Sequence, residues 1–142
     1  MQVAEEKLSR AAFRHIEAEL YSYHDTLKRI KELRKHIMFD NDNPDENVGG
    51  GKSNIPGKPT EQIATRLVMD KRLEKLEEMA EAIKFAYNAL TDDHRKVIET
   101  KYWSRKRLTW DDVAIQLNMH RNTAMKLRRD VVYLIANRIG WV

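Results

Sequence analysis

Apolar side chains recur at alternating steps of three and four residues through the first part of the chain. Arg34 replaces one apolar position in a series that otherwise consists of Phe13, Ile16, Leu20, Tyr23, Leu27, Ile30 and Ile37. Such steps place side chains on one face of an α-helix, whereas a half-buried strand would alternate every two residues. The pattern therefore predicts one long helix with a narrow apolar seam, suited to pairing with another helix.

A second stretch repeats this spacing. Its apolar residues are Leu73, Leu76, Ala80, Ile83, Tyr87 and Leu90. We expect Thr60 to cap this second long helix, with Pro59 ending the segment before it. Two seamed helices joined by one connection most simply form an antiparallel hairpin with a coiled-coil-like seam. Pairing of the seams between two subunits is the alternative, and the spacing does not decide between them.

Residues 39–59, which connect the two helices, contain many residues that oppose regular structure, among them Asn43, Pro44 and the three glycines 49–51. A segment of this length exceeds the usual helix–helix connection, which predicts a flexible loop. Residues 49–53 resemble the end of a nucleotide-binding P-loop. The position of that motif's first glycine is occupied by Glu46, however, so we interpret the segment as a turn.

The last third of the chain has the spacing of a DNA-reading helix-turn-helix. Thr109 and Asp112 form a capping-box-like start for its first helix, and Ala114 is small where two helices must cross closely. Asn118 stands at the turn, which needs a left-handed backbone that Asn tolerates well. The residues expected to be buried in this unit are Val113, Ala114, Leu117, Met119, Ala124, Leu127, Val131, Leu134, Ile135 and Ile139.

These inward positions leave a polar face on the second helix. The second helix of this motif lies in the major groove, where Arg can bond guanine and Asn can bond adenine bidentately. The residues predicted to contact bases are His120, Arg121, Asn122, Met125 and Lys126. Other basic side chains are better matched to phosphates, which set affinity and position but not base choice. These predicted phosphate contacts are Arg105, Lys106, Arg107, Arg128 and Arg129.

The charge is distributed unevenly along the chain. Residues 1–90 contain 15 Lys or Arg and 16 Asp or Glu, whereas residues 91–142 contain 11 and 6, within a net charge of +4. We therefore predict two domains: residues 1–90, a helical hairpin for dimerisation or partner contact, and residues 91–142, a module that binds a polyanion.

Several classes of protein are not favoured. The chain has no cysteine, no long apolar run and no secretory signal at its start, so we expect a cytoplasmic location without membrane contact. The five histidines lack metal-ligand spacing and, lying on charged helices, are expected to be exposed. No nucleophile–base pair is evident. We predict no enzymatic activity, catalytic residue, metal, cofactor or small-molecule substrate. The three tryptophans, Trp103, Trp110 and Trp141, suit core packing.

The C-terminal unit resembles the fourth conserved region of bacterial sigma factors, in which Leu and Thr, here Leu108 and Thr109, open the first helix. His120 stands where those motifs favour Ser, which predicts a weaker helix cap. The whole chain resembles the RinA/ArpU-type transcriptional activators of phages and prophages, through its long N-terminal helix, residues 47–50 and 58–61, and the sigma-like unit. That resemblance implies activation of late phage operons by binding promoter DNA together with host RNA polymerase.

The sequence thus predicts an all-α protein with an N-terminal helical hairpin and a C-terminal helix-turn-helix. We expect a sequence-specific regulator that binds double-stranded promoter DNA as a homodimer. One alternative is a DNA-packaging subunit similar to the small terminase subunit of phages, although placing the helices before the DNA-binding motif argues against it. Another is a protein–protein adaptor that does not bind duplex DNA. The residues alone do not separate an activator from a repressor.

Overall fold

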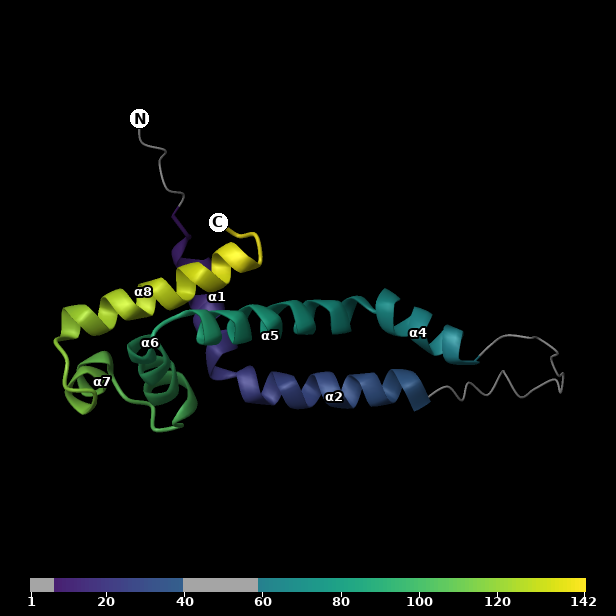
Figure 1. Ribbon diagram of the computed structural model, residues 1–142, viewed down its shortest axis with the longest axis horizontal. Coiled ribbons are helices and arrows are strands. Elements are labelled where there is room, and N and C mark those ends of the chain that lie inside the picture. Colours follow the sequence, from purple (N-terminus) through teal and green to yellow (C-terminus); the bar gives the residue numbers. More distant parts are fainter. Residues whose placement is uncertain (1–6, 40–58) are drawn as a thin grey trace, which may run out of the picture. The chain divides into compact units, whose positions relative to one another are not determined.

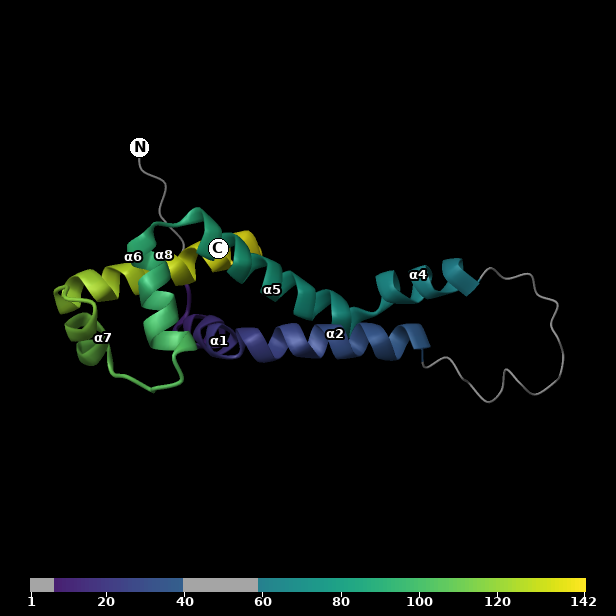
Figure 2. The same ribbon diagram turned by 60° about the horizontal axis from the view of Figure 1, so that its bottom comes forward.

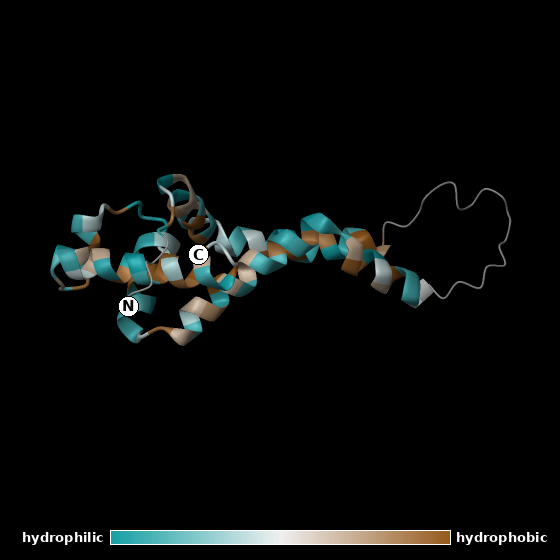
Figure 3. Ribbon diagram, turned by 90° about the horizontal axis from the view of Figure 1, so that it is seen from above, coloured by the Kyte–Doolittle hydropathy of each residue, from teal (hydrophilic) through white to brown (hydrophobic). Residues whose placement is uncertain are grey.

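The computed structural model describes residues 7–39 and 59–142, and all regular structure within these ranges is helical. This confirms the predicted all-α class. Figure 1 shows the elements in chain order: α1 (Arg10–Tyr21), α2 (Tyr23–Phe39), α4 (Pro59–Met69), α5 (Lys71–Ala89), α6 (Asp92–Val97), the π-helix η2 (Ile98–Trp103), α7 (Trp110–Gln116) and α8 (Arg121–Arg138). The helices have separate hydrophobic and hydrophilic sides (Figure 3), as the apolar spacing requires. Residues 40–58, which make up most of the predicted flexible loop, lie outside the described residues.

The first predicted helix is broken at Ser22, so the expectation of one continuous helix was wrong. Ser9 caps α1 by accepting the Ala12 N–H at 3.0 Å, and Ser22 ends it. A break rotates the following segment, so steps of three and four residues across it no longer select one face. Consequently Thr26 is buried at 6% exposure, whereas Leu27, predicted for the seam, is 40% exposed.

The second predicted helix is also divided, here at Asp70. Oδ1 of Asp70 accepts the backbone N–H groups of Arg72 at 2.9 Å and Leu73 at 3.0 Å, which caps α5. Moreover, α4 begins at Pro59 rather than after a Thr60 cap. Proline suits the first turn of a helix because its missing N–H would have no partner there. One capped helix was therefore predicted where two are present.

Contacts along the chain define two compact units. Unit 1 comprises Met1–His24 and Met79–Val142, described from residue 7, and unit 2 comprises Asp25–Glu78. The predicted domain boundary at residue 90 falls inside unit 1. In unit 2, Arg34 of α2 forms an ion pair with Glu77 of α5. The residue that interrupts the apolar seam therefore has a charged partner.

Helix α8 is the centre of unit 1, where it packs against α1, α6 and α7 (Figure 2). Its buried side includes Ala124, Leu127, Val131, Val132 and Ile135. Four residues predicted to be buried in this part of the chain are instead half-buried, namely Leu117, Met119, Leu134 and Ile139. Buried apolar residues therefore fix one side of α8, and its polar residues lie on the opposite side.

The tryptophans differ in their surroundings. Trp103 stacks on the rings of Tyr23 and Tyr87, each with centroids 5.2 Å apart, and its indole N–H donates to the Leu20 carbonyl at 3.0 Å. Trp110 is half-buried. Trp141 is 42% exposed, so its predicted place in the core was wrong. Its ring packs edge-on against His15, with 5.3 Å between centroids.

Candidate nucleic-acid interface

The turn between α7 and α8 is built from the residues that the sequence pattern identified. Thr109 Oγ1 accepts the Asp112 N–H at 3.1 Å, and Asp112 Oδ2 accepts the Thr109 N–H at 3.4 Å. This is the predicted capping box. Asn118 has φ 55°, the left-handed conformation expected at this position. The Met119 N–H donates to the Ala114 carbonyl at 2.9 Å, which holds the turn against the end of α7.

His120 is the N-cap of α8, and its side chain performs the function expected of serine at this position. Its Nδ1 accepts the backbone N–H of Asn122 at 2.9 Å, and α8 begins at Arg121. The hydrogen bond requires Nδ1 to be the unprotonated nitrogen of the ring. The start of the helix is thus defined by a side-chain cap, and the ring nitrogen that makes it is not free to contact a base.

Polar side chains project from the side of α8 opposite its buried residues. Asn122, Lys126 and Arg129 are exposed and follow each other at steps of four and three residues, which places them in one row. Met125, next to this row, is half-buried. The Arg129 guanidinium lies 4.2 Å from the centroid of the Tyr133 ring, a cation–π contact that supports its position. We call Asn122, Lys126 and Arg129 the α8 ridge.

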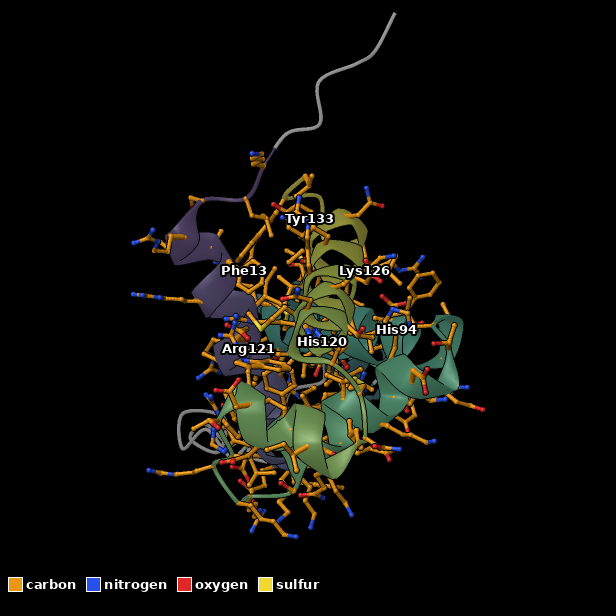
Figure 4. All side chains as sticks on the ribbon, turned by 90° about the vertical axis from the view of Figure 1, so that its left-hand side faces the viewer. Phe13, His94, His120, Arg121, Lys126 and Tyr133 are labelled. Atoms are coloured by element: carbon orange, nitrogen blue, oxygen red, sulfur yellow. The ribbon has the colours of Figure 1, made fainter. Side chains whose placement is uncertain are left out.

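Arg121 forms an ion pair across the turn. Its Nε lies 2.8 Å from Oδ1 of Asp111 in α7, and the two side chains are 56% and 69% exposed. Figure 4 shows Arg121 close to His120 at the start of α8, with Lys126 further along the helix. An exposed pair of this kind contributes little stability but still restricts the guanidinium. No pattern in the sequence indicated this pairing, because the two exposed side chains belong to different helices.

Arg128 is directed away from the α8 ridge. Its Nε and Nη2 donate to the two carboxylate oxygens of Glu17 in α1 at 2.9 and 2.7 Å. Its guanidinium also lies about 5 Å from the rings of Phe13 and Trp110. The hydrogen bonds to Glu17 raise the pKa of Arg128. These contacts do not support the prediction that Arg128 binds phosphate; the residue instead attaches α1 to α8.

Three of the predicted phosphate contacts lie in the segment between η2 and α7. Arg105, Lys106 and Arg107 are all exposed. Arg105 has φ 62° and Arg107 has φ 52°, in the left-handed region that few residues other than glycine adopt. The Lys106 N–H donates to Ser104 Oγ at 3.3 Å. The structure thus places three positive charges on one short segment with an unusual backbone.

His94 is buried, at 8% exposure, so the expectation that all five histidines are exposed was wrong for this residue. Its Nε2 lies 2.9 Å from Asp130 Oδ2 in α8, and its Nδ1 lies 2.7 Å from Thr91 Oγ1, the N-cap of α6. His94 therefore joins α6 to α8 through both ring nitrogens. Sequence spacing could not identify this role because Asp130 is 36 residues away.

Among residues 7–39 and 59–142, no group of three or more His, Asp or Glu side chains is arranged to hold a metal ion. Within the same ranges, no helix has both the length and the apolar composition required to cross a membrane.

Comparison with known proteins gives two matches along most of the chain. Residues 19–137 match the family described as "Protein of unknown function (DUF722)". The chain is 26% identical over 133 residues to the transcriptional activator RinA of Staphylococcus phage phi11, and the alignment covers 94% of each protein. No solved structure matches the chain significantly. The protein therefore belongs to the DUF722 family and resembles the phage activator RinA over nearly its whole length, in agreement with the resemblance seen in its sequence.

Proposed function

We propose that this protein is a phage transcription activator that binds promoter DNA through α7, the turn and α8, used as a sigma-like helix-turn-helix. The observation that carries the proposal is the α8 ridge: exposed polar and basic side chains on a helix whose start is set by Asn118 and His120. The first part of α8 would lie in the major groove. Similarity to an activator along 94% of the chain supports the same function.

The exposed side chains divide into two roles. Arg121, Asn122, Met125 and Lys126 are proposed to contact base edges, because the early residues of the second helix reach the bases in this motif. Arg129, together with the positively charged segment Arg105, Lys106 and Arg107, is proposed to contact phosphates. His120 acts as the helix cap in this proposal, and Arg128 is left out because Glu17 holds it.

Unit 2 is proposed to hold two copies together. Three apolar side chains in it are largely exposed: Val68 at 76%, Met69 at 69% and Phe39 at 68%. Burying such side chains against a second copy would favour a homodimer. A dimer with twofold symmetry would bind inverted half-sites separated by whole turns of the DNA helix. On this proposal the protein acts with host RNA polymerase in the bacterial cytoplasm, and it catalyses no reaction.

Selection of bound sequences from a random duplex library, followed by fluorescence anisotropy, tests the proposal. Arg121→Ala should weaken binding to the selected site by about 1–3 kcal/mol and relax the base preference at one position, because a bidentate contact is lost. Binding to random duplexes should change much less. Arg29→Ala, which removes the same charge from α2, is the matched control and should leave both affinities nearly unchanged.

Three results would contradict the proposal. An equal loss on selected and random DNA would show that Arg121 does not read bases. Absence of duplex binding at low salt would favour the protein–protein adaptor. A mass in solution corresponding to an octamer or larger ring would favour the DNA-packaging subunit, whereas the activator should be a dimer.

A further inference from the structure

A pocket with a volume of about 670 Å³ lies in unit 1 and is lined by Tyr21, Lys101, Tyr102, Arg105 and Arg107. Pockets for small molecules occupy roughly 300–1,000 Å³, so this one is large enough for an organic ligand of moderate size. Its walls come from the end of α1, from η2 and from the segment after η2. None of its lining residues belongs to the α8 ridge.

The charge of the pocket is positive and is not neutralised by its walls. Three of the five lining residues carry a positive charge and none carries a negative charge. Within the described part of the chain, Arg105 and Arg107 form no hydrogen bond or ion pair. Lys101 Nζ donates to the Leu108 carbonyl at 2.5 Å and lies 5.2 Å from the Trp110 ring. Three cations around one cavity repel each other, and a bound anion would remove this repulsion.

The backbone beside the pocket is unusual at several neighbouring positions. Lys101 and Tyr102 lie in the π-helix η2, and both Arg105 and Arg107 have positive φ. Ser104 stabilises this backbone conformation, because its Oγ donates to the Thr100 carbonyl at 2.6 Å. π-helical turns and left-handed non-glycine residues are uncommon and tend to occur at ligand sites. Here they bring the side chains of η2 and of the following segment to one cavity.

One wall of the pocket is aromatic. Tyr21 is 47% exposed, and its ring meets the Tyr102 ring edge-on with 4.9 Å between centroids. Tyr102 is buried, and its hydroxyl donates to Glu17 Oε2 at 2.6 Å, so this ring has a fixed position. Tyr21 is therefore an exposed ring beside three cations, a combination that binds nucleotides by stacking a base and pairing a phosphate.

We propose that this pocket binds a nucleotide, with its phosphate contacted by Arg105, Arg107 and Lys101 and its base stacked on Tyr21. A free mononucleotide and a nucleotide within a nucleic-acid strand present the same chemistry. Only binding of a nucleotide within a nucleic-acid strand rests on the proposed function. Binding of a free mononucleotide would make the pocket a site for a small phosphorylated ligand, separate from the α8 ridge.

Two-dimensional NMR of the ¹⁵N-labelled full chain can test this directly. Inorganic phosphate, adenosine 5′-monophosphate and a random-sequence duplex are titrated separately at low salt. We expect saturable shifts at the amides of residues 101–108 and Tyr21, with the mononucleotide binding more tightly than phosphate. Shifts there with the duplex alone would identify a nucleic-acid strand as the source. Amides of α8 in the same spectra report on the proposed DNA reading, so the two proposals can fail separately.

Variants distinguish the pocket from general positive charge. The double variant Arg105→Gly and Arg107→Gly keeps the left-handed backbone. It should weaken mononucleotide binding about tenfold or more, since two charge-assisted contacts are lost. The control, Lys84→Gln with Lys96→Gln, removes two exposed charges outside the pocket and should leave mononucleotide binding within about twofold of that of the parent protein. Tyr21→Ala should reduce mononucleotide binding to the level of phosphate, while Tyr21→Phe retains it.

Two outcomes would overturn the proposal. The first is that none of the three probes gives a saturable shift at the pocket. The second is that a glutamate-rich peptide binds the pocket as tightly as the mononucleotide, which would show recognition of carboxylates rather than phosphates.

Discussion

Replacing Glu17 by alanine should destabilise unit 1 far more than an ordinary change on a charged helix. The carboxylate of Glu17 accepts two hydrogen bonds from Arg128, at 2.9 and 2.7 Å, and one from the Tyr102 hydroxyl at 2.6 Å. Its side chain is only 13% exposed, and that of Arg128 is 24% exposed. Tyr102 is 3% exposed, so its hydroxyl would have no water to replace the lost acceptor.

The magnitude follows from these contacts. A buried hydroxyl without a partner costs about 1–3 kcal/mol, and breaking a buried ion pair from one side costs about 3–5 kcal/mol. Arg128 keeps some exposure and the rings of Phe13 and Trp110, so the lower end of each range applies. We expect a loss of about 3–4 kcal/mol in the free energy of unfolding. For a chain of this size the melting temperature should fall by roughly 10 °C.

Urea unfolding followed by tryptophan fluorescence measures this loss, because Trp110 lies next to Arg128. Glu19→Ala is the matched control. It removes another carboxylate of α1, which pairs with His15, and it should lower the free energy of unfolding by less than about 0.5 kcal/mol. Replacing Glu17 and Arg128 together by methionine should cost less than the sum of the single changes. A loss below about 1 kcal/mol for Glu17→Ala would refute the assigned coupling between α1 and α8.

Three further changes test separate parts of the structure. Lys106→Gln should weaken binding to all duplexes alike and reduce the slope of log K against log salt by about 0.9; an unchanged slope would remove Lys106 from the phosphate contacts. Asp70→Ala should lower the melting temperature by removing the cap of α5. The hydrogen bond from Arg72 lowers the pKa of Asp70, so the stabilisation that Asp70 gives is complete at neutral pH and is lost as pH falls through the lowered pKa. Thermal unfolding of the variant should therefore depend less on pH in acid than that of the parent protein. Burial raises the pKa of Tyr102, so above about pH 10 the hydroxyl loses its proton first in the unfolded chain, and the free energy of unfolding falls as pH rises. Tyr102→Phe should flatten that decline. An unchanged slope would show that Tyr102 does not cause it.

Helix breaks illustrate the limit of apolar spacing as a guide to the fold. The spacing correctly predicted helices but merged α1 with α2 and α4 with α5. Asp70 had a usable signal, since Asp is a favoured N-cap and lies just before Lys71, the first residue of α5. Ser22 had a weaker one, because exposed Ser is also tolerated inside helices. Apolar steps that continue across a break cannot reveal it, because spacing records which residues are apolar and not how the backbone turns.

In the candidate interface, too, features set by neighbouring residues were predictable and features set by packing were not. The capping box at Thr109 and the left-handed Asn118 were both predictable, since each depends on residues within about four positions. The cap at His120 was underestimated because a ring nitrogen replaced the usual hydroxyl oxygen. The pairing of Arg121 with Asp111 and the pocket beside Tyr21 required the packed structure, because their members come from different helices.

By itself the sequence determined the all-α class, the local geometry of the turn before α8 and the resemblance to phage activators. Only the tertiary structure decided which charged residues are free to bind a partner. Arg128 and Arg129 are adjacent in sequence but point about 100° apart on α8. Arg128 meets Glu17, 111 residues earlier in the chain, whereas Arg129 remains exposed on the α8 ridge. The physical reason is range: caps and turns depend on neighbours along the backbone, while burial and ion pairing depend on which distant helices packing brings together.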